Sequence, residues 1–243
     1  MVYKSKKPLQ RLSNKQIFED VKKYIKTSHT FYETKIPELK VLAKRLHDEY
    51  DLKEFYKIFN KLWNSGKNEE RSLAIHTLPL YKDNFDIETW KFLKPKLKDI
   101  KSWDKVDIVS LDIIGEMLTK NKPMEKEIIM MAKSKNIWSK RMAIISTIPL
   151  IKNGETELAL NISKQCLYAK EEPIQMAVGR VLKEIAEEKP VIAKRFILKN
   201  IHMPLKTFVI ATENMKELRK LRDVKKLGHK TSIVKSIKNI FQR

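Results

Sequence analysis

The sequence is poor in the residues that form metal centres, disulfides and nucleotide-binding loops. Its single cysteine, Cys166, excludes an intrachain disulfide and a cysteine-rich zinc site. Its five histidines are scattered and show neither an HExxH motif nor another paired spacing. Its five glycines form neither a GxGxxG nor a GxxxxGK frame, the patterns that cradle the phosphates of nucleotides. We therefore expect no metal and no cofactor.

Long hydrophobic runs are also missing. The longest mainly apolar stretch, residues 142–151, contains two hydroxyl side chains and Pro149, and it is far shorter than a bilayer-spanning helix. The first twelve residues are polar and basic and have no apolar core of the signal-peptide kind. We expect a protein without a membrane segment, located in the cytoplasm and associated with the nucleoid.

Acidic residues are in short supply. Asp and Glu together number 30 against 51 Lys and Arg, which leaves a formal net charge of +21 on 243 residues. The first sixteen residues hold five basic residues and no acid, and residues 216–243 hold ten basic residues against two acids. A single charge run is usually only a solvated helix face, but an excess of this size predicts a polyanionic partner. Nucleic acid is the first expectation, and an anionic membrane surface is the second.

The apolar residues follow a helical period along the chain. They recur at i, i+3, i+4 and i+7 in segments of 12 to 18 residues separated by short polar breaks, and glycine and proline are too few for a β-sandwich or barrel. Helix-start signals occur at or near Ser13, Pro37, Leu52, Asn68, Asp86, Ser102, Pro123, Ile137, Glu155, Pro173, Pro190 and Pro204. Taken alternately, these starts give helix pairs with a period of about 34 residues. We predict an all-α, right-handed helical-repeat solenoid of the HEAT-like kind, with about six helix pairs and a concave basic groove.

One pair of segments supports this period directly. Residues 78–83, Leu-Pro-Leu-Tyr-Lys-Asp, return as Ile-Pro-Leu-Ile-Lys-Asn at residues 148–153, two repeats later. Elsewhere the repeats share a pattern and not identical residues, so an irregular helical bundle stays open as the alternative. Because no linker or change of composition divides the chain, we predict a single domain over residues 1–243, with a basic tail from about residue 229.

Unusual residues collect near the starts of the second helices of the predicted pairs. Trp103 and Asp107 lie four residues apart and so share a helix face. Arg141 follows Asp107 by one repeat, and Arg180 lies on the same face of the next second helix. Equivalent helices of adjacent repeats lie side by side, so a carboxylate, an aromatic ring and two guanidinium groups are expected to converge.

Each of these residues also has a simpler interpretation. Asp104 and Asp107 are placed to complement the positive end of a helix, and Trp103 and Trp138 are typical packing residues. Arg141 is a reasonable partner for a neighbouring acid. The functional interpretation depends on their alignment at one repeat offset and not on any one residue.

These segments resemble the HEAT-like repeat DNA alkylation repair proteins, the AlkD-type DNA glycosylases. The resemblance spans nearly the whole chain. It rests on Ser-Trp-Asp-Lys-Val-Asp at 102–107, Asn-Ile-Trp-Ser-Lys-Arg at 136–141, Lys-Ile-Pro-Glu-Leu-Lys at 35–40, and Ile174 and Gln175 with Ala177, Gly179, Val181, Leu182 and Glu184.

The resemblance implies a monofunctional glycosylase that hydrolyses the N-glycosidic bond of cationic N3- or N7-alkylated purines in duplex DNA and leaves an abasic site. It implies that Asp107 supplies the negative charge opposite the forming oxocarbenium-like sugar, that Trp103 packs on the deoxyribose, and that Arg141 holds the adjacent phosphate. It further implies that DNA-binding residues are Tyr24, Lys35, Lys40, Arg180 and Lys183. We expect a monomer.

Arg180 departs from the family pattern, which has a second tryptophan at this position. A guanidinium holds phosphate well, but near a forming cation its charge opposes the reaction. A noncatalytic HEAT-like protein that binds DNA structures therefore stays open as the alternative. A protein scaffold, the commonest use of helical repeats, is the third reading, and the net charge argues against it.

Overall fold

The computed structural model describes residues 36–220, and every regular element within them is a helix. The all-α prediction is confirmed for this part of the chain. The predicted start at Ser13, the residues Tyr24 and Lys35, and the basic tail from about residue 229 lie outside the described residues. No helix among residues 36–220 is both long enough and apolar enough to cross a membrane.

Contacts between residues divide the chain into two compact units, residues 1–95 and residues 96–243. The described helices of the first unit are α2 (Ile36–Glu49), α3 (Leu52–Asn64), α4 (Asn68–Thr77), the 3₁₀ segment η2 (Leu78–Asn84) and α5 (Ile87–Leu93). The short 3₁₀ segment η3 (Lys94–Asp99) contains the boundary. The prediction of a single domain stays a prediction.

Capping residues fix the starts of α3 and α5 in the first unit. Asp51 and Asp86 each accept a hydrogen bond from the backbone N–H three residues later and so complete a capping box. The core of this unit is aromatic: the ring of Tyr81 stacks on that of Phe55, with centroids 5.1 Å apart. The Tyr81 hydroxyl donates to the carbonyl of Tyr50 at 2.8 Å, so this buried polar group has a partner.

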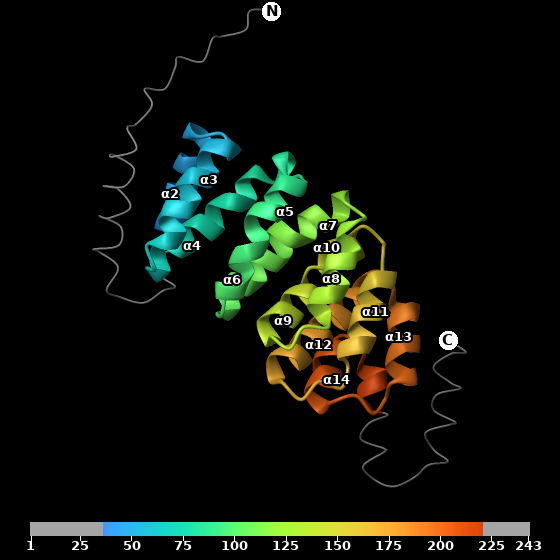
Figure 1. Ribbon diagram of the computed structural model, residues 1–243. Helices are drawn as coiled ribbons and strands as arrows, with labels where there is room; N and C mark the ends of the chain where they lie inside the picture. Colours follow the sequence, from blue (N-terminus) through green and yellow to red (C-terminus); the bar gives the residue numbers. More distant parts are fainter. Residues whose placement is uncertain (1–35, 221–243) are drawn as a thin grey trace, which may run out of the picture. The chain divides into compact units, whose positions relative to one another are not determined.

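The second unit contains the helices that carry the predicted site (Figure 1). They are α6 (Trp103–Ile108), the π-helical segment η4 (Val109–Gly115), α7 (Glu116–Lys120), α8 (Met124–Ala132), α9 (Ile137–Ile145), α10 (Ile148–Lys152), α11 (Glu157–Cys166), α12 (Glu172–Glu188), α13 (Pro190–Lys199) and α14 (Leu205–Ala211). The second helices of successive pairs pack in sequence, α6 on α9, α9 on α12 and α12 on α14. This order places equivalent positions of neighbouring repeats side by side.

Two glycines allow close packing between these helices. A Cβ atom on Gly179 of α12 would lie 2.8 Å from Cβ of Ile210 on α14, and one on Gly115 would lie 2.6 Å from Cγ of Pro149 on α10. Real Cβ atoms essentially never approach another atom so closely. Glycine at position 179 therefore sets the distance between α12 and α14, one residue before Arg180.

Candidate functional site

Four of the predicted site residues meet within the second unit. Trp103 and Asp107 lie on α6, Arg141 lies on α9 and Arg180 lies on α12. Asp107 makes hydrogen bonds to both arginines, and the guanidinium of Arg141 lies over the ring of Trp103. The convergence expected from the repeat offset is present. The catalytic and binding roles of these residues stay predictions.

The pair between Asp107 and Arg141 is bidentate. Nε of Arg141 donates to Oδ1 of Asp107 at 2.9 Å, and Nη2 donates to Oδ2 at 2.9 Å. Two parallel bonds from a planar fork fix both the position and the plane of the carboxylate. The carboxylate is therefore held in one orientation while 27% of the Asp107 side chain stays exposed.

Arg141 is buried and its donors are engaged. Only 5% of its side chain is exposed, and Nη1 donates to the carbonyl oxygen of Pro173 at 2.9 Å. Burial lowers the pKa of the Arg141 guanidinium, and the charge of Asp107 opposes that shift. The family resemblance assigns a phosphate to Arg141, but in this structure its fork faces Asp107. Three of its five N–H donors are bound in this way, and the low exposure of the side chain limits the access of a phosphate to the other two.

Arg180 adds a second guanidinium to the same carboxylate. Its Nη1 donates to Oδ2 of Asp107 at 3.1 Å, and 38% of its side chain is exposed. Arg180 is thus far more accessible than Arg141. One carboxylate faces two cations here, so the group as a whole carries one excess positive charge. An anion such as a phosphate is attracted to it, and Arg180 has the exposure to meet one.

Trp103 supplies the flat surface of the site. The residue is 40% exposed, and Cζ of Arg141 lies 4.2 Å from the centroid of its ring. Trp138 packs against Trp103 edge to face, with centroids 5.8 Å apart and an interplanar angle of 84°. Trp138 therefore supports Trp103, in agreement with the packing role that the sequence left open for it. The ring of Trp103 is held by a cation and a second ring.

Among the other predicted binding residues, Lys183 makes a separate ion pair within the second unit. Lys183 on α12 pairs with Glu213, with Nζ 2.8 Å from Oε2, and the hydrogen bond raises the pKa of the lysine. Lys40 is an exposed residue of α2 in the first unit. Tyr24 and Lys35 lie outside the described residues. For these four residues a contact with DNA stays a prediction.

One functional contact was missed by sequence reasoning. The carbonyl oxygen of Pro173 accepts a hydrogen bond from Arg141, and the sequence marked this proline only as a helix start. A spacing of 32 residues, close to one repeat, was the available signal. A backbone carbonyl carries no sequence signature, so the sequence alone does not predict this hydrogen bond.

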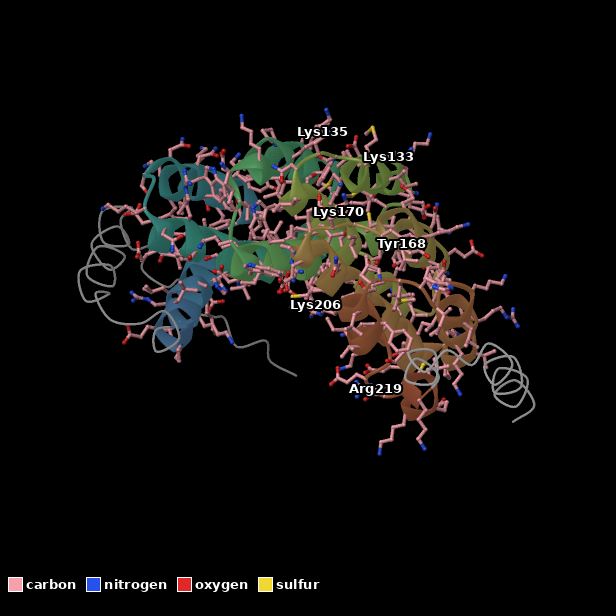
Figure 2. The ribbon with its side chains drawn as sticks, turned by 90° about the horizontal axis from the view of Figure 1, so that it is seen from below. Lys133, Lys135, Tyr168, Lys170, Lys206 and Arg219 are labelled. Atoms are coloured by element: carbon pink, nitrogen blue, oxygen red, sulfur yellow. The ribbon has the colours of Figure 1, made fainter. Side chains whose placement is uncertain are left out.

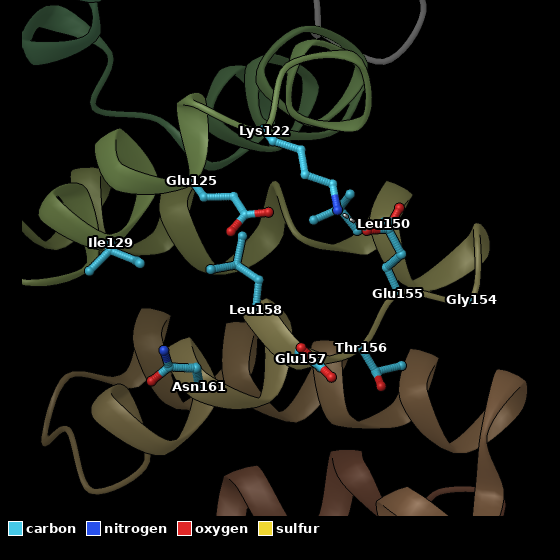
Figure 3. Close-up of a pocket in the computed structure, with 10 residues that line it drawn as sticks. All are labelled: Lys122, Glu125, Ile129, Leu150, Gly154, Glu155, Thr156, Glu157, Leu158 and Asn161. Atoms are coloured by element: carbon cyan, nitrogen blue, oxygen red, sulfur yellow. Dashed lines mark ion pairs between the residues drawn. The ribbon is translucent and has the colours of Figure 1, made fainter.

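A separate hollow of about 650 Å³ contains none of the predicted site residues (Figure 3). It is lined mainly by residues of α8, the α10–α11 loop and α11, and Glu125, Glu155 and Glu157 give it an acidic character. Lys122 pairs with Glu155, with Nζ 4.0 Å from Oε2. Among residues 36–220, no group of three or more His, Cys, Asp or Glu side chains is arranged to hold a metal ion.

A family model and two solved structures of similar fold relate the chain to DNA alkylation repair proteins. The family described as DNA alkylation repair enzyme matches residues 5–217. A solved structure described as a predicted DNA alkylation repair enzyme from Enterococcus faecalis superposes with a TM-score of 0.68 at 17% identity, covering 86% of this chain and 99% of the other. AlkD2 from Streptococcus mutans superposes with a TM-score of 0.61 at 18% identity, covering 83% of this chain and 98% of the other. No significant match is found among curated proteins.

Proposed function

The chain belongs to the DNA alkylation repair enzyme family, and on that premise we propose that it is a monofunctional, cofactor-free DNA glycosylase. Its substrate is duplex DNA that carries a cationic N3- or N7-alkylated purine, and its product is an abasic site. The proposal keeps the location predicted from the sequence, the cytoplasm with association to the nucleoid. The observation that supports it most is the carboxylate of Asp107, which is held by Arg141, the same residue whose guanidinium lies over the partly exposed ring of Trp103.

The proposed reaction requires the protein mainly to stabilise the positive charge that develops on the sugar. An alkylated purine already carries a positive charge and is a good leaving group, so the barrier lies in the cation that develops on the sugar. A carboxylate whose orientation is fixed before the reaction stabilises that cation without a cost of reorganisation. Asp107 provides that charge, and Trp103 provides a surface against which the deoxyribose packs.

The hydrogen bonds of Asp107 leave room for this role. An ionised carboxylate offers about four lone-pair positions. Arg141 donates to Oδ1 and to Oδ2, its Nη2 also lies 2.8 Å from Oδ1, and Arg180 donates to Oδ2, so both arginines share Oδ2 whereas Oδ1 faces Arg141 alone. In our proposal Oδ1 orients the attacking water or faces the sugar. Oδ2 stays bound to the two arginines.

The test is excision from a duplex that contains a single N7-methylguanine, followed by alkaline cleavage at any abasic site. We expect Asp107→Asn to lower the single-turnover rate by about 10² or more, because an opposing charge is lost in the transition state. The matched control is Asp112→Asn, an exposed residue on the adjoining η4 segment, which is expected to keep the parent rate. Thermal unfolding of both variants separates lost chemistry from lost folding, because Asp107→Asn leaves a buried guanidinium without its anion. An Asp107→Asn variant as fast as the parent would show that another group does the chemistry.

A second function is favoured by one contact. Nη1 of Arg180 sits 3.1 Å from Oδ2 of Asp107, where its charge offsets the negative charge that a glycosylase needs. The alternative proposal is a noncatalytic protein that binds DNA structures and keeps the basic surface. A parent protein that binds duplex DNA with strong salt dependence, but excises no N7-methylguanine, would establish this alternative.

A further inference from the structure

Beside the candidate site, the second unit carries an exposed tyrosine among lysines. The Tyr168 rim consists of Lys133 and Lys135, which follow α8, Lys140 on α9, and Tyr168 and Lys170 in the loop between α11 and α12. Figure 2 labels four of these five residues in one part of the view. None of the five belongs to the candidate site around Asp107.

Three residues of the rim, Lys133, Lys140 and Tyr168, line a hollow of about 470 Å³. Cys166 and Glu171 also line it. Tyr168 is 61% exposed, a large value for an aromatic residue in a loop of only a few residues. Its ring therefore offers an uncovered apolar face next to cationic side chains.

Hydrogen bonds and packing hold the rim in place. Sγ of Cys166 lies 3.8 Å from the carbonyl oxygen of Ala132 and links the ends of α11 and α8. Nε2 of Gln175 donates to the carbonyl oxygens of Ala169 at 3.0 Å and of Lys170 at 3.3 Å. Leu167, beside Tyr168, is buried. The tyrosine is thus presented from an anchored turn, which lowers the entropy lost when a ligand binds.

The charges of the rim are available to a partner. Within residues 36–220, Lys133, Lys135, Lys140 and Lys170 form no ion pair. Glu171 is the acid that lines the hollow, and the neighbouring Glu172 is paired with Lys206. Four lysines against one carboxylate give the rim a clear positive excess, which suits phosphate groups.

The rim is continuous with the candidate site along the chain. Trp138, which supports Trp103, comes three residues after Lys135. Pro173, whose carbonyl binds Arg141, comes three residues after Lys170. Lys140 of the rim and Arg141 of the candidate site are also neighbours on α9.

We propose that the Tyr168 rim binds unpaired nucleotides of a single strand, with one base stacked on the Tyr168 ring and the flanking phosphates held by Lys133 and Lys170. Inside a duplex each base is covered by its neighbours, so only an unpaired base presents a face to an exposed ring. Aromatic stacking with flanking cations is the usual way in which proteins hold single strands. The rim gives the protein a preference for duplexes that continue into a single strand, and this preference does not depend on glycosylase activity.

The test compares the affinity of the full chain for two undamaged duplexes of the same paired sequence. One is blunt, and the other continues at either end into about ten unpaired thymidines, within the usual site size of one stacking groove. We expect tighter binding to the tailed duplex. Tyr168→Ala should reduce this advantage by about tenfold, the scale of one lost stack, and should leave binding to the blunt duplex unchanged. Tyr168→Phe should retain the advantage, because the ring and not the hydroxyl makes the contact.

Two lysine variants, one in the rim and one outside it, test the phosphate contacts. Lys170→Gln should reduce the slope of log affinity against log salt for the tailed duplex by about 0.7. Lys152 is the exposed last residue of α10, and Lys152→Gln should leave this slope unchanged. An equal loss on both duplexes would show that the rim contacts paired DNA instead. No loss in Tyr168→Ala would overturn the proposal outright. Neither duplex carries a lesion, so failure here leaves the excision assay and the proposed glycosylase unaffected.

Discussion

At the scale of single residues, the two arginines around Asp107 have opposite environments. Arg141 is buried, and its donors bind Asp107 and the Pro173 carbonyl, whereas Arg180 reaches the same carboxylate from an exposed position. A charge that is buried and paired is hard to move, while an exposed one exchanges partners with solvent or phosphate. Variants at the two positions should therefore behave differently.

Arg180→Trp should raise the single-turnover rate on N7-methylguanine DNA several-fold and weaken binding to undamaged DNA. The substitution removes a positive charge from Oδ2 of Asp107 and places a ring where the family pattern has one. The ring contacts only the reacting nucleotide, whereas the lost charge attracted every duplex alike. Rates and affinities measured side by side check both parts. If Arg180→Trp were slower than the parent and Arg180→Ala slower still, the arginine would be a working part of the site.

Arg141→Ala should destabilise the protein by about 3 kcal/mol, because it removes one partner of a largely buried pair and leaves the Pro173 carbonyl without its donor. Denaturant unfolding measures the loss. Lys183→Ala is the comparison, since its pair with Glu213 is exposed, and exposed pairs contribute little. Equal stability of the two variants would mean that the fork of Arg141 is not held as described.

The residue scale also shows what the sequence could predict of the site. Trp103, Asp107, Arg141 and Arg180 were found because a repeat period converts sequence spacing into spatial neighbourhood. The hydrogen bonds within the group were not predicted, since a spacing does not tell whether a guanidinium faces a carboxylate or solvent. The exposed Tyr168 was missed for the same reason, because exposure in a loop depends on how two helix ends pack.

At the scale of helices, starts were predicted better than lengths. Asp51, Asp86 and Asn136 form the side-chain caps on which the starts near Leu52, Asp86 and Ile137 depend. Several expected helices of 12 to 18 residues are instead shorter pieces. The run from Trp103 to Lys120 contains the π-helical segment η4 directly after α6, and local propensity does not encode such a segment.

Gly179→Ala should destabilise the second unit by about 1–3 kcal/mol, although alanine is the better helix former. The new Cβ would meet Cβ of Ile210 at 2.8 Å, so α14 must shift away from α12. The unfolding temperature and the excision rate should both fall, because α12 carries Arg180. A stabilised Gly179→Ala variant would show that helix propensity outweighs the close approach of the two helices.

Cys166 reports on the packing of α11 against α8. Its side chain is buried, and burial raises the pKa of the thiol, so little thiolate is present near neutral pH. We expect a soluble disulfide reagent to label the native protein far more slowly than the protein in denaturant. The rate should rise with pH as the thiolate forms. Equal rates in the two states would contradict the described packing.

At the scale of the whole molecule, the net charge of +21 governs encounters with DNA. The affinity for undamaged duplex should fall linearly on a log–log plot against salt, because several Lys and Arg displace counterions. Fluorescence anisotropy over a salt series gives the slope. Binding that ignores salt, or no binding at low salt, would favour a protein scaffold over both DNA-directed functions.

The contact between Arg180 and Asp107 joins residues 73 positions apart, a little more than two repeats. Repeat proteins usually unfold as a row of units, each sensing only its direct neighbours. This ion pair joins α6 to α12 directly, although α9 lies between them in the repeat order. We therefore expect the three helices to unfold cooperatively. Hydrogen exchange should then find the amides of these three helices protected as one cooperative block, and Arg180→Ala should split that block. In that case Arg180, which differs from the family pattern, would determine the unfolding cooperativity of the protein as well as its binding.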